Sequence, residues 1–241
     1  MLKAVFFDLD GTLLPFNEDE FLKSYFKLIS GKMINYGFEP KALIDNIWNG
    51  TKLMYKNDGT KTNEEVFWDY FANVYGKEVL DKKSEFDKFY TNEFKQLKSC
   101  CGDNNSAKEI VDYVNENKLL CVLSTNPIFP KVGTLTRMSF VGLREQDFEF
   151  VTAYENYNFS KPNPMYFKGL LEKFNLKPEE VILFGNNELE DAWCANQVGI
   201  KTYLVGDFII TSDKLETKVP VLKMEEVVTT IKQEIELRRL F

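Results

Sequence analysis

The sequence predicts an α/β protein with a doubly wound, mostly parallel sheet and an inserted α-helical segment. Short apolar runs alternate with helical patterns, and this alternation favours parallel strands joined by helical crossovers. The clearest runs are apolar almost throughout, as expected for strands that helices cover on both faces. Five runs are predicted to be strands: Leu2–Phe7, Leu119–Leu123, Glu149–Ala153, Val181–Phe184 and Lys201–Val205.

Several helix ends are marked by residues that satisfy the free backbone groups there. Ser106 and Glu109 have the spacing of a capping box, as do Thr62 and Glu65, so a helix is expected to begin at each pair. Gly199 follows a helical pattern and is expected to end that helix, because glycine accepts the left-handed backbone of this position.

The segment from residue 15 to residue 96 differs from the rest, because it carries several helical patterns and no convincing strand. The sequence therefore predicts two parts: a sheet-forming core made of residues 1–14 and 97–241, and a helical insert made of residues 15–96. The large aromatic residues of the insert are expected to pack between its helices: Phe21, Trp48 and Trp68. Polar candidates for contacts with a ligand are Asn17, Lys52 and Tyr55.

The composition excludes several classes of function. The chain has 241 residues, a formal net charge of -7 and no histidine. A chain this acidic offers no basic surface, so nucleic acid and anionic membranes are not expected partners. No apolar run approaches the roughly 18 residues of a spanning helix, and four uncharged residues before Asp8 are too few for a secretion signal. We therefore expect a cytoplasmic protein whose proton transfers use carboxylates, Lys, Tyr or water.

Two aspartates, Asp8 and Asp10, follow the first predicted strand and precede Gly11. Side chains two residues apart on a strand point to the same side, and open α/β sheets bind ligands at the carboxyl ends of their strands. Two crowded carboxylates repel each other unless a cation or a proton lies between them. The pair therefore predicts a metal-assisted site in which one carboxylate is ionised and the other shares a proton during turnover.

Three further elements occur at the ends of predicted strands or before a helix. They are Ser124-Thr125-Asn126 after the second strand, Lys161 before a helix, and the run from Gly185 to Asp191 after the fourth strand. Taken alone, each element also fits an ordinary turn, a helix start or a surface lysine. Their joint order along the chain is what favours a common site.

With these four elements in order, the sequence resembles the haloacid dehalogenase-like (HAD) hydrolase superfamily, whose members are mostly phosphatases. The resemblance covers the whole sheet-forming part and implies a Rossmann-like catalytic core, with residues 15–96 as a helical (C1-type) cap. It implies a Mg²⁺-dependent phosphatase that hydrolyses a small phosphorylated metabolite through an aspartyl-phosphate intermediate. Asp10 argues against the dehalogenase branch, which does not need the second acid of the pair.

The resemblance also implies a role for each residue. Asp8 is the expected nucleophile, Asp10 the expected general acid and base, and Lys161 the expected positive charge beside the phosphoryl group. Such groups are needed because phosphate monoesters hydrolyse very slowly without catalysis. The expected phosphate ligands are Gly11, Thr12, Thr125, Asn126 and Lys161. The expected Mg²⁺ ligands are Asp8, a main-chain oxygen of Asp10, Asn186 and Asp191, with Asn187 as a further candidate.

The fourth element departs from the pattern of the family, which places a carboxylate directly after the glycine. Here that position is Asn186, and a second amide, Asn187, follows it. A neutral oxygen can still bind Mg²⁺, but the site loses one negative charge, so weaker metal binding is expected unless Asp191 or Glu188 compensates.

Two other functions remain open at this point. A phosphotransferase or mutase of the same superfamily would need a cap that excludes water and binds a second hydroxyl. A binding or regulatory protein could have kept the fold and lost turnover through Asn186 and Asn187. Neither the substrate nor the oligomeric state follows from the sequence.

Overall fold

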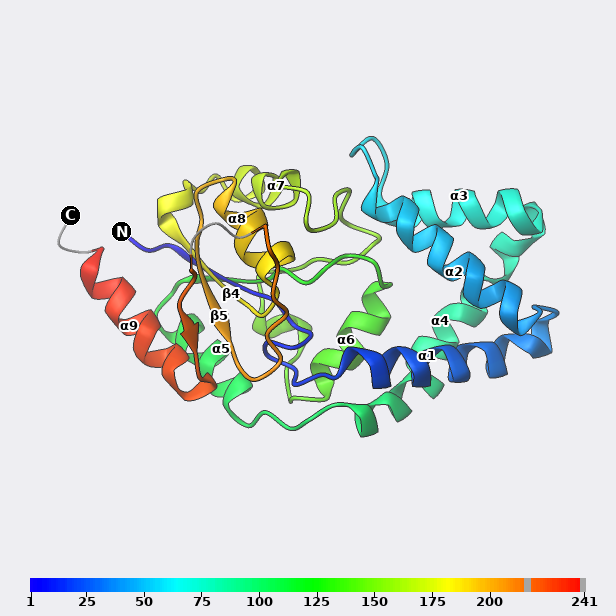
Figure 1. Ribbon diagram of the computed structural model, residues 1–241, viewed down its shortest axis with the longest axis horizontal. Coiled ribbons are helices and arrows are strands. Elements are labelled where there is room, and N and C mark those ends of the chain that lie inside the picture. Colours follow the sequence, from blue (N-terminus) through cyan, green and yellow to red (C-terminus); the bar gives the residue numbers. More distant parts are fainter. Residues whose placement is uncertain (215–217, 239–241) are drawn as a thin grey trace.

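The computed structural model describes residues 1–214 and 218–238 (Figure 1). In this part of the chain, one six-stranded sheet has the order β3-β2-β1-β4-β5-β6, and every neighbouring pair is parallel. The strands are β1 (Ala4–Phe7), β2 (Leu120–Leu123), β3 (Phe150–Val151), β4 (Val181–Gly185), β5 (Lys201–Val205) and β6 (Val221–Leu222). The expected α/β fold is confirmed. The sequence does not predict β6, because its two partly exposed residues form no apolar run.

Helices cover both faces of this sheet. Alternate residues of β1 point to opposite faces, so Val5 and Phe7 pack toward one helical layer and Ala4 and Phe6 toward the other. The first layer contains α5 (Ser106–Glu116), α6 (Lys131–Ser139) and α9 (Val227–Leu237), and the second contains α7 (Met165–Lys173) and α8 (Cys194–Asn196). Figure 1 shows α7 and α8 above the sheet and α5 and α9 below it.

The predicted helix ends are confirmed at two of three places. The hydroxyl oxygen of Thr62 accepts a hydrogen bond from the amide of Glu65, whose carboxylate accepts from the amide of Thr62, so this capping box forms. Gly199 adopts a φ of 84° after the last turn, as expected for a helix end. The capping box at Ser106 is wrong, because Ser106 is already helical and its amide donates to the side chain of Asn104.

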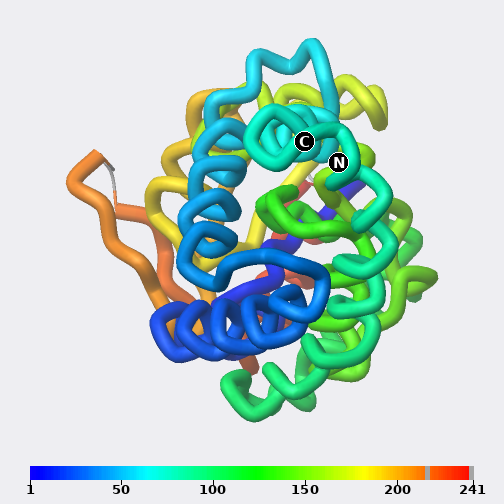
Figure 2. The backbone as a smooth tube through the Cα atoms, turned by 90° about the vertical axis from the view of Figure 1, so that its right-hand side faces the viewer, coloured from blue at the N-terminus to red at the C-terminus, as the bar shows by residue number. Residues whose placement is uncertain are grey.

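The chain between β1 and α5 forms helices with a hydrophobic core of their own. They are α1 (Glu18–Met33), α2 (Pro40–Tyr55), α3 (Asn63–Tyr75) and α4 (Lys83–Thr91), with α2 lying between α1 and α3 (Figure 2). Rings of Phe21, Trp68 and Phe71 are buried in this core. Leu97 packs there too, although the sequence prediction assigns it to the sheet-forming part.

The two connections between the sheet and these helices lie side by side. The amide of Gly102 donates to the carbonyl of Pro15 at 2.9 Å, and Phe16 pairs with Cys101 in an antiparallel bridge. The chain therefore leaves the sheet and returns to it at one place. No helix within residues 1–214 and 218–238 has both the length and the apolar character needed to cross a bilayer.

The side chain of Glu234 connects α9 to β5 of the sheet. Its buried carboxylate accepts hydrogen bonds from Lys201 at 2.6 Å, Tyr203 at 2.7 Å and Arg238 at 3.0 Å. Burial alone would raise the pKa of Glu234, but the bonds from Lys201 and Tyr203 and the nearby positive charges bring its pKa below the ordinary value. The ionised carboxylate is therefore stabilised by the fold.

We predict that Glu234→Gln lowers the free energy of unfolding at pH 7 by about 2 kcal/mol, because hydrogen bonds to a charged group are lost in a buried place. A lowered pKa contributes stability above the ordinary glutamate pKa, and this contribution disappears as pH falls through the lowered pKa. The gap between variant and wild type should therefore shrink in urea unfolding below about pH 4.

Glu236→Gln, an exposed change on the same helix, serves as the control and should leave the unfolding free energy almost unchanged. A Glu234→Gln protein as stable as wild type at pH 7 would contradict this account.

Candidate active site

The carboxyl ends of three parallel strands, β2, β1 and β4, meet where the strand order of the sheet reverses. β1 lies between β2 and β4, and the amide of Asp8 donates to the carbonyl of Phe184 at 2.9 Å. On the other side, the amide of Ser124 donates to the carbonyl of Phe7 at 2.7 Å. This register places Asp8, Ser124 and the turn after β4 side by side at the same end of the sheet. Doubly wound sheets bind their ligands in the crevice at this place.

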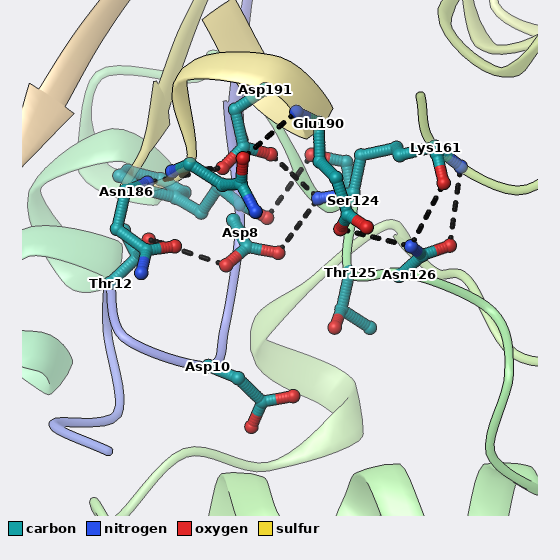
Figure 3. A network of polar contacts seen from close by, with 12 residues as sticks. Asp8, Asp10, Thr12, Ser124, Thr125, Asn126, Lys161, Asn186, Glu190 and Asp191 are labelled. Atoms are coloured by element: carbon teal, nitrogen blue, oxygen red, sulfur yellow. Dashed lines mark hydrogen bonds and ion pairs between the residues drawn. The ribbon is translucent and has the colours of Figure 1, made fainter. Parts of the chain in front are cut away.

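Lys161 lies between two aspartates at the centre of this crevice (Figure 3). Its Nζ is 2.8 Å from Oδ1 of Asp8 and 2.6 Å from Oδ1 of Asp191, and all three side chains are buried. Burial alone would lower the pKa of Lys161, but Asp191 and Asp8 raise it well above its ordinary value. The side chain therefore carries a fixed positive charge against Asp8.

Asp191 is held by the turn that follows β4. Its Oδ2 accepts hydrogen bonds from the amides of Asn186 and Asn187, each at 3.1 Å. A Cβ atom at Gly185 would lie 2.4 Å from this carboxyl group, so glycine leaves the room that Asp191 needs. The carbonyl oxygen of the Asn187 side chain caps the next turn by accepting from Leu189 and Glu190 amides.

Asp8 has an unusually high proton affinity. Burial raises its pKa to about 7, with further upward effects from Asp191 and Asp10 and a lowering effect from Lys161. The Thr12 hydroxyl lies 3.3 Å from Oδ2 of Asp8 and 3.5 Å from Oδ1 of Asn186. These two oxygens therefore face the same hydroxyl from neighbouring strand ends.

Gly11 permits this close approach of the two strand ends. Its φ is 80°, and a Cβ atom there would lie 2.1 Å from Nδ2 of Asn186. A side chain at this position would both strain the backbone and displace the asparagine.

Asn126 is an expected phosphate ligand, but in the structure its side chain contacts Glu190 and the backbone of Lys161. Its Nδ2 donates to Oε2 of Glu190 at 3.0 Å and to the carbonyl of Lys161, and its Oδ1 accepts from the Lys161 amide. Both ends of the amide thus hold the backbone of Lys161 in place. Thr125, its neighbour, is buried and lines the cavity described below.

Glu190 is a site residue that the sequence prediction lacks. Burial raises the pKa of Glu190 to about 7, while Lys161 lowers it and Asp191 raises it. The Tyr55 hydroxyl donates to its Oε1 at 3.4 Å, so this carboxyl connects the site to α2. The only sequence signal is its position one residue before Asp191 in the fourth element.

Asp10 forms an ion pair that the sequence prediction also lacks. Its Oδ2 accepts from Nη1 of Arg137 at 2.7 Å, and the guanidinium lies over the ring of Phe129. Burial raises the pKa of Asp10, and Arg137 and Lys161 partly offset this effect. Oδ1 of Asp10 is buried and has no hydrogen-bond partner among the described residues. Figure 3 shows that the side chain points away from the contacts around Lys161.

Arg137 carries a weak signal in the sequence. It is one of two charged residues on the helix that follows the second element, and such a residue is by default placed on the surface. Here it is buried because Asp10 and an aromatic ring receive it.

A cavity of about 450 Å³ extends from these polar groups into the helical segment. Its polar end includes Asp8, Asp10 and Lys161, and its walls are formed mainly by apolar and aromatic side chains, most of them on α1 to α4. Trp48 lines this cavity and is 40% exposed, so its assignment to the packing core is wrong. Of the polar candidates, Asn17 and Tyr55 line the cavity, whereas Lys52 is exposed elsewhere on α2.

The loop after β5 closes one side of the cavity. Nδ2 of Asn186 donates to the carbonyl of Phe208 at 2.7 Å, and the amide of Ile210 donates to the carbonyl of Asn186 at 2.9 Å. Only an amide side chain can make the first bond, because a carboxylate has no proton to donate. Asn186, which stands where the family pattern has a carboxylate, therefore holds the loop after β5 through this bond. The sequence alone does not reveal this role.

The charges of the site fit a divalent cation. Six carboxyl groups and two cationic side chains line the cavity in the described residues, so negative charge is in excess. Asp8 and Asn186 offer oxygens on the same side of Thr12, and oxygen donors are the ligands that Mg²⁺ prefers. Within residues 1–214 and 218–238, however, no cluster of three or more Asp, Glu, His or Cys side chains could hold a metal. Main-chain and amide oxygens would have to complete the ligand set.

Comparison with known proteins identifies the family. A family profile described as haloacid dehalogenase-like hydrolase matches residues 5–205, so the chain belongs to this family of enzymes. The glyceraldehyde 3-phosphate phosphatase of Pyrococcus furiosus is 27% identical over 206 residues, which are 83% of this chain and 79% of the relative. The expected family and the expected enzyme class, a phosphatase, are confirmed.

Solved structures share the fold at low sequence identity. A HAD phosphatase from Thermococcus onnurineus is 15% identical, has a TM-score of 0.61, and matches over 95% of this chain and 98% of its own. A HAD enzyme from Bacteroides thetaiotaomicron, solved with magnesium and inorganic phosphate, is 21% identical, with a TM-score of 0.52 and coverage of 90% and 100%. These likenesses concern the fold alone.

We predict that Asn186→Asp tightens Mg²⁺ binding about tenfold in a calorimetric titration, because it adds one negative charge beside Asp8. The same change should lower the melting temperature in EDTA, because the hydrogen bond to the Phe208 carbonyl is replaced by repulsion.

Asn187→Asp is the matched control: it adds the same charge one residue away and leaves the contact with Phe208 in place. It should change the Mg²⁺ affinity less than Asn186→Asp does. Equal Mg²⁺ affinity of the wild type and Asn186→Asp would contradict the placement of the metal beside Asn186.

Proposed function

We propose that the protein is a Mg²⁺-dependent phosphatase that hydrolyses a small phosphorylated metabolite through an aspartyl-phosphate at Asp8. The observation that carries this proposal is the buried arrangement in which Lys161 contacts Asp8 and Asp191 at the end of β1. A nucleophilic carboxylate and a fixed positive charge are thereby directed to the same end of the cavity.

The first step forms one bond and breaks another. A carboxylate oxygen of Asp8 attacks the phosphorus, the bond between phosphorus and the ester oxygen breaks, and the leaving alcohol takes a proton from Asp10. Lys161 balances negative charge on the phosphoryl oxygens, and Thr12 and Thr125 are proposed as hydrogen-bond donors to them. Gly11 allows the backbone to lie close to the phosphoryl group.

The second step restores the enzyme. Water attacks the phosphorus of the aspartyl-phosphate, Asp10 accepts a proton from that water, and the bond from phosphorus to Asp8 breaks to release inorganic phosphate. The raised pKa of Asp10 suits a group that must hold a proton and later accept one, and so does its buried Oδ1, which lacks a hydrogen-bond partner within residues 1–214 and 218–238. Arg137 holds the other oxygen and so fixes the orientation of this carboxyl.

Mg²⁺ would be held by Asp8, the main-chain oxygen of Asp10 and Asn186, and would supply positive charge that stabilises the transferring phosphoryl group. Asp191 and Asn187 are proposed to support this site indirectly, since the Asp191 oxygens bind Lys161 and two amides and the Asn187 carbonyl caps a turn.

Helices α1 to α4 are proposed to act as the cap. They contribute most of the apolar cavity wall, and the adjacent passages at Pro15 and Gly102 give them a common base on the sheet. Glyceraldehyde 3-phosphate, the substrate named for the Pyrococcus relative, is the first metabolite to assay. A phosphotransferase or mutase is the second candidate and would pass the phosphoryl group to a hydroxyl other than water.

We predict that the protein releases phosphate from 4-nitrophenyl phosphate only with Mg²⁺, and that Asp8→Asn reduces kcat at least about 10³-fold. The measurement is phosphate release with Mg²⁺ or EDTA. Trapping the wild type in acid during turnover should yield one acid-stable, hydroxylamine-sensitive phosphate per chain, absent in Asp8→Asn.

Asp69→Asn, an exposed aspartate on α3, is the control for the loss of one carboxylate. If the protein binds inorganic phosphate but releases none from a broad panel of phosphate esters with Mg²⁺, it is a binding protein and not an enzyme. Transfer to an added alcohol in preference to water would favour the phosphotransferase.

We predict that Asp10→Asn slows alkyl phosphates much more than 4-nitrophenyl phosphate, by about 10²–10³-fold against about tenfold, because a poor leaving group needs the proton. Steady-state kcat values for the two ester types provide the comparison. An equal loss of kcat for both ester types would show that Asp10 does not act as the general acid.

A further inference from the structure

We propose, on the basis of the phosphatase function above, that the substrate is a phosphate monoester of an apolar alcohol or phenol with no second anionic group. Phosphorylated sugars and phosphorylated carboxylic acids are then poor substrates. The inference follows from the part of the cavity that lies beyond the phosphoryl end, between α1 and α2.

Four buried aromatic side chains around this part of the cavity are hydrogen-bonded to one another in two pairs. The hydroxyls of Tyr25 and Tyr90 are hydrogen-bonded to each other at 2.8 Å. Nε1 of Trp68 donates to the hydroxyl of Tyr154 at 3.2 Å. These pairs use part of the hydrogen-bonding capacity of the four side chains, and their rings form apolar surface in the cavity wall.

Two smaller polar side chains of the wall each make one hydrogen bond to the helix backbone. Oδ1 of Asn17 accepts from the Glu20 amide at the start of α1, and the Thr51 hydroxyl donates to the carbonyl of Ile47 on α2. A sugar has a hydroxyl on most of its carbons, and burying these without partners is costly. Since most side chains of the lining are apolar or aromatic, the wall is suited to a ligand with few polar atoms.

The charges of the lining exclude a second anionic group. Lys161 and Arg137 are the cationic side chains among the described residues of the lining, and both are paired with carboxylates. Glu18 and Asp19, at the start of α1, add negative charge to the same lining. A carboxylate or second phosphate on the substrate would therefore meet repulsion and find no free cation.

An aromatic pair provides the apolar contact. The rings of Phe26 on α1 and Trp48 on α2 lie 5.4 Å apart, and both line the cavity. Trp48 is 40% exposed, so its ring is not fully covered by the protein and is available for contact with a ligand. The alcohol part of the substrate is placed against this pair.

The first test varies only the apolar length of the substrate. We expect kcat/KM for ethyl, butyl and hexyl phosphate to rise about threefold to fourfold per methylene, as apolar surface is removed from water. Butyl phosphate should also exceed glyceraldehyde 3-phosphate and 2-phosphoglycolate.

The second test changes the proposed wall. Trp48→Ala should lower the ratio of kcat/KM for hexyl phosphate to that for ethyl phosphate about tenfold, mainly through KM. Leu53→Ala is the matched control, because Leu53 lies on the same helix, is equally exposed at 40%, and does not line the cavity. It should leave this ratio unchanged.

The outcomes separate this inference from the function on which it rests. Mg²⁺-dependent turnover that is fastest with glyceraldehyde 3-phosphate or 2-phosphoglycolate, with no effect of Trp48→Ala on the ratio, overturns the substrate class and leaves the phosphatase intact. No Mg²⁺-dependent release from any ester overturns both. A rising series that Trp48→Ala flattens and Leu53→Ala does not supports the inference.

Discussion

The contact of one buried lysine with two buried aspartates is the interaction on which the rest of the site depends. Asp8 comes from β1, Asp191 from the turn after β4, and Lys161 from the chain before α7. A buried ion group of this kind is stable only when further hydrogen bonds satisfy its remaining atoms. Two amides satisfy Asp191, and Asn126 holds the Lys161 backbone, which explains why the turns around the site are so closely specified.

The molecule separates reactive groups from the surfaces that would recognise a ligand. The reactive groups lie at the ends of buried parallel strands, where a rigid sheet fixes their spacing. The apolar walls of the cavity come mainly from helices with a separate hydrophobic core. Such a division lets one set of catalytic residues serve different substrates when the helical walls change. The apolar and aromatic majority of the side chains in those walls is the feature that suits the cavity to an apolar ligand.

The sequence predicts the sheet well because a strand that is buried on both faces must be apolar and is followed by residues that form a turn. β1, β2, β4 and β5 are found within a residue or two of their predicted bounds, whereas β6 has too little apolar character to be detected. The family is also recognisable from local order alone. The boundary near Leu97 and the place of Trp48 in the cavity wall do not follow from the sequence, because both depend on which surfaces meet after folding.

The sequence by itself determined the fold class, the family, and which strand ends carry the acidic and amide groups, since these depend on local periodicity and the order of short elements. Only the tertiary structure decided the pairing of Asp10 with Arg137, the position of Glu190 and the bond from Asn186 to the loop at Phe208. These contacts join residues 22 to 127 positions apart. No local pattern encodes such a distance, because it is the packing of the sheet and helices that brings those residues together.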